Sequence, residues 1–325
     1  MHRRTLAHWA ALGLFALAAP AALAQTKLKW AHVYETGEPY HKQAVWAADE
    51  IKKRTGGRYE IEVFPASTLG KETEINQGLQ LGTVDIIYTG MAFAGRAYPP
   101  MSIASAPFVF RDYAHWQAFR SGPVFKDIVN AYAQKTSGQH IAGYTYYGLR
   151  HMTSNKPITK PDDMKGLKLR VPDAPLFVMF PKAVGANPTP IAFAEVYLAL
   201  QNGTVDAQEN PLPTIDAKKF YEVQKYITLT GHITESLVTI VAGPAWAKLN
   251  DADKKIFDAV LWEASGRAGQ EILDAENRLV AEFEKRGKIV AKVDRAPFAA
   301  AVRGPLTAAD APWPRELFDR IQAIK

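Results

Sequence analysis

The sequence of 325 residues contains no cysteine, and this absence excludes several kinds of site. Without thiols the protein has no disulfide bond, no cysteine-ligated zinc, no thiol nucleophile and no lipid anchor attached through an N-terminal cysteine. The hydrophobic core alone must therefore stabilise the fold. About 300 residues can provide such a core when they are arranged as two domains.

The sequence also lacks the short motifs of common enzyme classes. We find no Gly-x-Ser-x-Gly, His-Glu-x-x-His, Gly-x-x-x-x-Gly-Lys or Gly-x-Gly-x-x-Gly, and the histidines after residue 25 show no metal-ligand spacing. We therefore expect neither catalysis, nor a metal, nor a cofactor. A hydrolase that uses a pair of carboxyl groups stays open as an alternative, because single acidic residues are plentiful.

Long apolar runs are missing after the N-terminus. Residues 1–24 begin with Arg3 and Arg4, continue with an apolar stretch and end in Ala-Leu-Ala, which is typical of a secretion signal cleaved before Gln25. The apolar stretch is shorter than the roughly 20 residues of a membrane span. We therefore predict a periplasmic protein that does not itself span the membrane.

Charge of one sign is not concentrated anywhere in the chain. The formal net charge is +6, from 39 Lys and Arg against 33 Asp and Glu, and loss of Arg3 and Arg4 lowers it further. We interpret the short clusters of lysine and arginine as solvent-exposed faces of helices. This pattern argues against a nucleic-acid partner.

Strand and helix patterns alternate twice along the chain. The first set has strands at 27–32, 59–64 and 83–88 and helices at 39–54 and 69–81. The second set has strands at 138–147, 167–171 and 204–208 and helices at 174–184 and 192–201. Gly-Thr-Val-Asp occurs at a helix-to-strand junction in both sets. This order predicts an α/β protein with parallel strand pairs and two lobes of similar architecture.

A long helical pattern follows, from Pro244 to about residue 285. A helix of about 40 residues would be about 60 Å long, so we expect it to span both lobes. Gly266 and Gly269 are candidate bending points. We assign residues 25–147 with about 236–275 to lobe I, and 148–235 with about 276–325 to lobe II.

Two arginines stand near the predicted lobe boundary. Arg170 ends a short apolar strand before Pro172, and Arg150 follows the strand at 138–147. In open α/β sheets ligands gather beyond the carboxyl ends of strands, and arginine grips a carboxylate through two parallel hydrogen bonds. A structural ion pair explains Arg170 equally well at this stage.

Asn210 and Phe193 are further candidates for the same cleft. Asn210 follows the strand at 204–208 and offers a donor and an acceptor, and Phe193 offers an apolar wall. The alternatives are a turn residue before Pro211 and simple core packing.

Five segments together resemble a known family. They are Arg150-x-x-Thr153-Ser154-Asn155, Met164-Lys165-Gly166-Leu167-Lys168-Leu169-Arg170-Val171-Pro172, Pro188-Thr189-Pro190, Phe193-x-Glu195-Val196-Tyr197-x-Ala199-Leu200-Gln201 and Asp206-x-Gln208-Glu209-Asn210-Pro211. They look like the DctP family, the extracytoplasmic solute-binding proteins of TRAP transporters, and are similar in particular to its sialic-acid-binding members. The resemblance covers essentially the whole chain after the signal segment. It implies the two-lobed periplasmic-binding-protein fold, with a ligand cleft between the lobes and a membrane permease as partner.

The resemblance also implies roles for individual residues. Arg170 matches the main carboxylate clamp, Arg150 a second ligand contact, and Asn210 and Phe193 pocket residues. Glu209 and His232 match residues that hold the clamp arginine in place, since a buried arginine needs such partners. His32 and Glu72 fall near first-lobe positions that reach the distal end of a ligand.

Two departures from the sialic-acid branch bear on the ligand. This chain has Gly90 where that branch has an acidic residue, and Asp173 where it has asparagine. We therefore expect a smaller carboxylate, such as a uronate, an aldonate or a C4-dicarboxylate. Sialic acid, a periplasmic sugar-acid hydrolase or lyase, and a protein that only presents its ligand to a sensor are the alternatives.

Overall fold

The computed structural model describes residues 25–325, so the predicted signal segment lies outside the described residues. The strands are β1 (Thr26–Ala31), β2 (Tyr59–Phe64), β3 (Ile86–Gly90), β4 (His140–Ser154), β5 (Lys168–Val171), β6 (Asn187–Pro190), β7 (Ala207–Pro211), β8 (Tyr226–Val241) and β9 (Ile289–Lys292). The α-helices are α1 (Pro39–Arg54), α2 (Glu72–Leu81), α3 (Met91–Ala94), α4 (Tyr113–Ser121), α5 (Pro123–Lys135), α6 (Met179–Ala183), α7 (Val196–Gln201), α8 (Leu212–Ala217), α9 (Phe220–Val223), α10 (Gly243–Lys248), α11 (Asp251–Lys285), α12 (Ala296–Leu306) and α13 (Arg315–Gln322). The 3₁₀ helices are η1 (Pro99–Ser105), η2 (Pro161–Met164), η3 (Pro175–Val178) and η4 (Phe193–Glu195).

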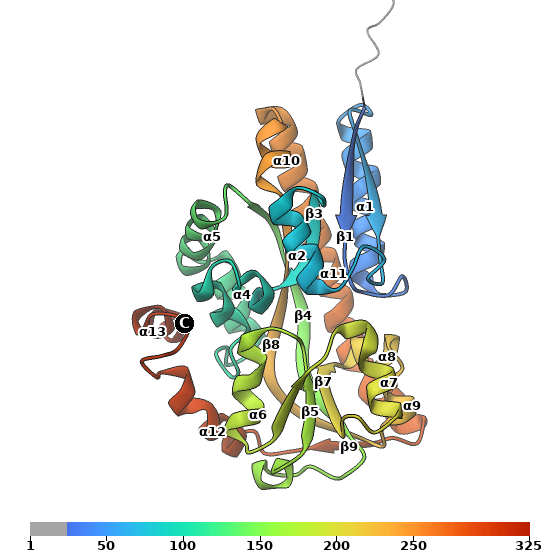
Figure 1. Cartoon of the computed structure of the whole chain (residues 1–325), viewed down its shortest axis with the longest axis vertical. Helices are drawn as coiled ribbons and strands as arrows, with labels where there is room; N and C mark the ends of the chain where they lie inside the picture. Colours follow the sequence, from blue (N-terminus) through green and yellow to red (C-terminus); the bar gives the residue numbers. More distant parts are fainter. Residues whose placement is uncertain (1–24) are drawn as a thin grey trace, which may run out of the picture.

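All strands of the described chain join one mixed sheet. Its order is β2-β1-β3-β8-β4-β7-β5-β6, and β9 pairs with β8 (Figure 1). The pairs β1·β2, β1·β3, β5·β6 and β5·β7 are parallel, as the alternating strand and helix pattern predicts. Figure 1 shows β1–β3 with α1 and α2 in the upper lobe, and β5 and β7 with α6–α9 in the lower lobe.

The two longest strands connect the lobes. β4 has 15 residues and β8 has 16, and they pair antiparallel over nearly their whole length. The strand predicted at 138–147 thus continues through the lobe boundary. Register shifts interrupt the ladder at Tyr146/Gly148 and Arg150/Met152, in the middle of the molecule. Bulges of this kind bend a strand and redirect its side chains.

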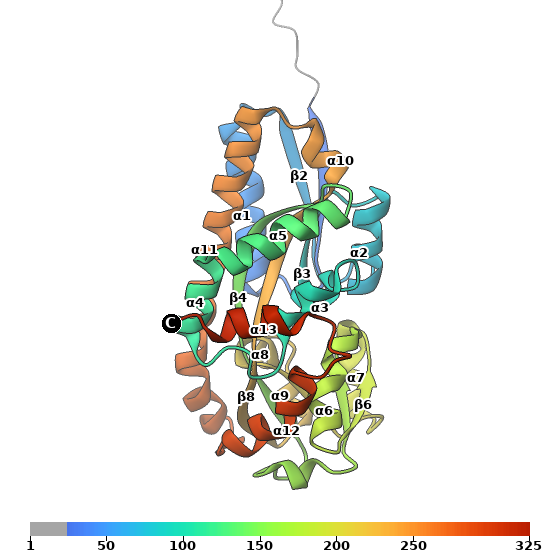
Figure 2. The same cartoon turned by 90° about the vertical axis from the view of Figure 1, so that its left-hand side faces the viewer.

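Helix α11 also runs along both lobes and packs beside α1 in the upper one (Figures 1 and 2). Its 35 residues give a length of about 52 Å. The predicted helix from Pro244 is interrupted, because Leu249 is extended and Asn250 caps α11 by accepting a hydrogen bond from the Asp253 backbone N–H. A Cβ atom added to Gly269 would lie 3.3 Å from Tyr146, so glycine lets α11 approach β4 closely.

The helix predicted at 174–184 is wrong as a single element. The chain instead forms η3 and the short α6, with Pro175 at the start of the first and Pro181 inside the second. A proline inside a helix removes a backbone donor and clashes with the preceding turn, which explains the short pieces.

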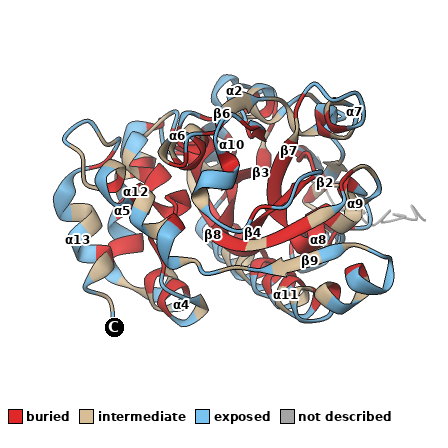
Figure 3. Cartoon of the chain, turned by 90° about the horizontal axis from the view of Figure 1, so that it is seen from below, coloured by how far each residue is buried: buried red, intermediate tan, exposed pale blue. Residues whose placement is uncertain are grey.

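Buried residues concentrate along the central strands. Figure 3 shows β3, β4, β7 and β8 mostly buried, whereas α2 and α13 expose their outer faces. A large core cluster involves both sides of the sheet, and a smaller one lies under α7–α9 and the end of α11. Within residues 25–325 no helix combines the length and the apolar content that crossing a membrane requires.

Candidate ligand-binding site

A cavity lies where the two lobes face each other across the middle of the sheet. It holds about 550 Å³ of space between atoms, including solvent at its mouth. Five predicted site residues line it, namely Glu72, Arg150, Arg170, Phe193 and Asn210. Its other lining residues are Val33, Tyr34, Lys71, Thr73, Gly90, Phe93, Tyr147, Pro172, Asp173, Phe177, Ala192, Glu235 and Leu237.

Arg170 is held at the end of β5 with one nitrogen left over. Its side chain is buried, and its Nε and Nη2 atoms donate to the Ile191 carbonyl at 3.0 and 2.7 Å. Its Nη1 atom has no hydrogen-bond partner among the described residues. Burial lowers the pKa of Arg170 to about 10, so the guanidinium stays protonated at neutral pH. A buried donor without a partner is costly, and an anionic acceptor in the cavity removes that cost.

Arg150, on β4, is fixed by an acidic partner. Its guanidinium binds both carboxylate oxygens of Glu209 and the Glu209 carbonyl, with Nη2 at 2.8 Å from Oε1 and from the carbonyl. Glu209 is also 3.2 Å from His232 Nε2, and the other ring nitrogen of His232 is 2.8 Å from the Thr230 hydroxyl. Burial opposes ionisation of Glu209, but Arg150 and His232 prevail and lower its pKa to about 2.

The expectation that Glu209 and His232 hold Arg170 is therefore corrected. β7 pairs antiparallel with β4, with Met152 opposite Glu209, so the Glu209 side chain reaches the neighbouring Arg150. Arg170 is supported by a backbone carbonyl instead. The supporting residues were identified, but they support the other arginine.

Asn210 and Phe193 both have cavity-facing side chains with further contacts. Asn210 accepts a hydrogen bond from Arg150 Nη2 at 3.3 Å and donates to Gln208 at 2.6 Å. It lies within β7 and is not a turn residue. The Phe193 ring lies 6.1 Å from the Tyr34 ring, and the Lys218 ammonium is 5.2 Å from its centre.

In the upper lobe, Glu72 lines the cavity and His32 does not. Glu72 Oε1 accepts from the Thr89 hydroxyl and the Gly90 backbone N–H, both at 2.9 Å, and burial raises the Glu72 pKa. His32 is buried beside His41, and burial together with this neighbour lowers its pKa to about 3. His32 is thus a neutral structural residue, and Tyr34, two positions later, reaches the cavity in its place.

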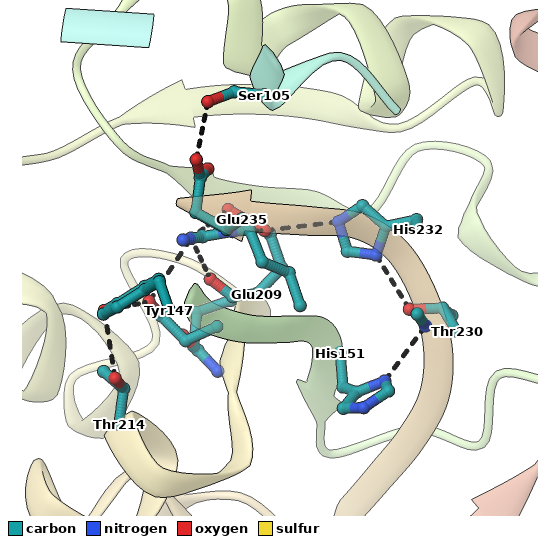
Figure 4. A network of polar contacts seen from close by, with 12 residues as sticks. Ser105, Tyr147, His151, Glu209, Thr214, Thr230, His232 and Glu235 are labelled. Atoms are coloured by element: carbon teal, nitrogen blue, oxygen red, sulfur yellow. Dashed lines mark hydrogen bonds and ion pairs between the residues drawn. The ribbon is translucent and has the colours of Figure 1, made fainter. Parts of the chain in front are cut away.

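Glu235 lines the cavity and was missed from the sequence. It lies on β8, and its Oε1 accepts from the Ser105 hydroxyl at 2.5 Å and from the Ser236 backbone N–H at 2.9 Å (Figure 4). Burial raises its pKa to about 7. The signal in the sequence is an acidic residue within the largely apolar stretch from 233 to 241.

Three charged pairs join the two lobes near the cavity. Lys71 at the start of α2 lies 2.5 Å from Glu195, Lys218 lies 2.6 Å from Glu35, and Arg96 donates to the Asp173 carbonyl at 2.7 Å. Each pair joins a residue of the upper lobe to one of the lower lobe, so the lobes are closed on each other. Residues 25–325 contain no group of three or more acidic or histidine side chains placed to hold a metal ion.

Comparison with known proteins agrees with this architecture. The family described as bacterial extracellular solute-binding protein, family 7 (DctP), matches residues 30–308. A solute-binding protein of Roseobacter denitrificans is 38% identical over 299 residues, covering 90% of each chain, and its crystal structure contains L-galactonate (TM-score 0.85, covering 92% of this chain and 98% of that one).

Two further relatives show the range of ligands. A TRAP periplasmic solute-binding protein of Polaromonas, bound to D-erythronate, is 36% identical with a TM-score of 0.88 and covers 93% of this chain and 99% of its own. The sialic acid-binding protein SiaP of Vibrio cholerae is 34% identical over 293 residues, covering 90% of this chain and 91% of its own. With its two-lobed fold and its inter-lobe cavity, this chain belongs to the DctP family of solute-binding proteins of TRAP transporters.

Proposed function

We propose that this protein captures a carboxylate-bearing solute in the periplasm through Arg170 and delivers it to the membrane permease of a TRAP transporter. The observation that carries the proposal is the free Nη1 atom of Arg170, a buried cationic donor at the wall of the cavity. A carboxylate on Arg170 gains charge-assisted hydrogen bonds that water in a closed cleft cannot equal.

Arg150 is a second hydrogen-bond donor in the cavity wall, and its charge is already neutralised by Glu209. Because Glu209 accepts hydrogen bonds from Nε and Nη2 along one edge of the guanidinium, Arg150 is oriented before ligand arrives, and Asn210 is tied to the same group. Preorganised groups lose little entropy on binding. Arg150, held by Glu209, therefore orients the ligand, while Arg170 supplies the uncompensated positive charge that attracts it.

The free donor of Arg170 and the other polar groups placed in the cavity wall favour a small organic acid. A uronate, an aldonate and a C4-dicarboxylate are the candidate solutes, and sialic acid is the alternative. Gly90 contributes only its backbone N–H, which Glu72 already engages, so Gly90 itself offers no side chain to the distal end of a large sugar acid.

Delivery depends on closure of the lobes. A ligand that binds the closed form better than the open form shifts the population toward closure. The pairs Lys71–Glu195, Lys218–Glu35 and Arg96–Asp173 join the two lobes, so they add to the stability of the closed arrangement. Such hinge closure around a ligand is a common way for two-lobed proteins to signal occupancy.

Titration calorimetry on an Arg170→Ala variant tests the clamp. We expect a loss of about 2–5 kcal/mol in binding free energy for the carboxylates that the wild type binds, the range for truncating one member of a buried charge pair. Arg170→Lys also weakens binding, because a point charge loses the two-pronged geometry. Arg120→Ala, a partly buried arginine that does not line the cavity, is the control. Unchanged affinity in Arg170→Ala refutes the clamp.

We propose binding without chemical turnover. The carboxyl groups that line the cavity, Glu72, Asp173 and Glu235, are engaged by donors of the protein itself, the first and last at one oxygen and Asp173 through Arg96. Incubation of the protein with each bound acid, followed by mass spectrometry of the small-molecule fraction, tests this. Recovery of a product would favour the hydrolase or lyase alternative.

A further inference from the structure

One oxygen of the buried Glu235 carboxyl has no partner in the closed cavity. The side chain is 2% exposed, and its Oε1 atom accepts both available donors, from Ser105 and Ser236. Its Oε2 atom is buried and accepts no hydrogen bond from any described residue. A buried oxygen left in this state costs free energy until a donor reaches it, and the cavity is the side from which a donor can come.

The charges around the cavity leave room for one anion. Glu209 neutralises Arg150, and Lys71 at the rim is paired with Glu195. Arg170 contacts only a carbonyl within the described chain, so it is the buried cation that remains uncommitted. Three carboxyl groups line the same space: Asp173, which is paired with Arg96, and those of Glu72 and Glu235.

A second carboxylate in the solute would therefore meet acidic groups and no free cation. Burying an anion without a partner is far more costly than burying a hydroxyl that finds an acceptor. A hydroxyl group can donate to Glu235 Oε2 and, when the carboxyl group is protonated, accept from it. Burial raises the pKa of Glu235 to about 7, so its protonated form is accessible near neutral pH. Burial raises the pKa of Glu72 as well.

We infer that Glu235 binds a hydroxyl group of the solute and that the cavity thereby selects hydroxylated monocarboxylates over dicarboxylates. This inference rests on the proposed function and narrows it from organic acids in general to acids with a single carboxylate. Glu235 is then a specificity residue, and Arg170 sets affinity for all carboxylates alike.

Two four-carbon acids distinguish selection for hydroxylated monocarboxylates from selection for dicarboxylates. D-Erythronate has one carboxylate and several hydroxyl groups, whereas succinate has two carboxylates and no hydroxyl group. Calorimetry of the wild type at pH 7.5 should give at least about tenfold tighter binding of D-erythronate, the value of about one good hydrogen bond to a charged group. L-Galactonate and D-glucuronate extend the series to longer hydroxylated monocarboxylates. L-Threonine tests whether an ammonium group, rather than a hydroxyl, is the donor.

Two substitutions assign the preference to Glu235. Glu235→Gln keeps hydrogen bonding and removes the charge, so it should narrow the gap between the two acids by strengthening succinate. Glu235→Leu should weaken D-erythronate about tenfold or more and leave succinate no weaker. Glu276→Gln, at a carboxyl group with a similarly raised pKa that does not line the cavity, should leave the affinity ratio unchanged.

The outcomes distinguish this inference from the proposed function. If no carboxylate binds the wild type, the proposed function fails. If succinate binds the wild type as tightly as D-erythronate, if L-threonine binds tighter than both, or if neither Glu235 variant changes the ratio, the inference about Glu235 fails while solute binding stands. Thermal unfolding of each variant confirms that it is folded.

Discussion

Removing the charge of Glu209 should destabilise the whole protein, because Arg150 depends on it. The two side chains are 1% and 3% exposed and form a two-pronged ion pair, and no other described acidic side chain contacts the Arg150 guanidinium. In Glu209→Gln the amide keeps the volume but leaves a buried cation uncompensated. Breaking a buried pair in this way costs about 3–5 kcal/mol of unfolding free energy.

Urea unfolding measures this loss. With a slope of about 3 kcal/mol per molar, the midpoint should fall by about 1 M or more at unchanged slope. Glu222→Gln, at an exposed carboxylate within α9, should change stability by less than about 0.5 kcal/mol. A double variant, Arg150→Met with Glu209→Leu, should be more stable than Glu209→Gln, because it removes both charges together.

Acid titration gives an independent check on the same pair. The pKa of Glu209 is lowered from 4.5 to about 2, so its stabilising contribution is complete above about pH 4.5 and is lost as the pH falls toward 2. Wild type and Glu209→Gln should therefore converge in stability at low pH. A loss below about 1 kcal/mol at pH 7, or a difference that persists unchanged at pH 2, would show that Arg150 does not rely on Glu209.

Two further predictions concern pH and the rim of the cavity. Burial raises the pKa values of Glu235 and Glu276 to about 7 and of Glu38 to about 8, so the stability that these protonated groups give below about pH 4.5 is lost as the pH rises. Unfolding free energy measured by urea denaturation should fall between about pH 4.5 and pH 8, and a flat profile would contradict the raised values. Lys218→Glu replaces the attraction between Lys218 and Glu35 by repulsion and should speed dissociation of a bound carboxylate about three- to tenfold in stopped-flow experiments, with a smaller effect in high salt. Lys219→Glu should have little effect on the dissociation rate.

The sequence predicts the elements of this site better than their pairings. The local pattern predicts Arg150, Arg170 and Asn210 near one cleft, and all three line the cavity, although Arg150 and Asn210 lie within β4 and β7 and not beyond the strand ends. Which arginine Glu209 supports depends on the register of β7 against β4, more than 50 residues away in sequence, and no local pattern encodes it. Glu235 was missed for a similar reason, since its role depends on β8 crossing the sheet beside β4.

Helix boundaries show a second kind of limit. The amphipathic pattern predicts α1 with its observed bounds, because proline begins it and Thr55 follows its last residue. The same kind of pattern over 174–184 ignores Pro181, and the pattern from Pro244 ignores the extended Leu249. Local backbone chemistry decided these boundaries, and apolar spacing alone did not.

The continuous strands β4 and β8 run through both lobes and couple the motion of one lobe to that of the other. Neither lobe can be excised as an independent folding unit, because each would keep half of the same two strands and expose new sheet edges. Opening of the lobes is therefore not a free rotation about a flexible linker. Opening must instead twist the paired strands β4 and β8 at their register shifts near Gly148 and Met152. The paired strands therefore favour one angle between the lobes. The free-energy cost of twisting these strands therefore contributes, together with the arginine contacts, to the solute concentration at which the closed form predominates.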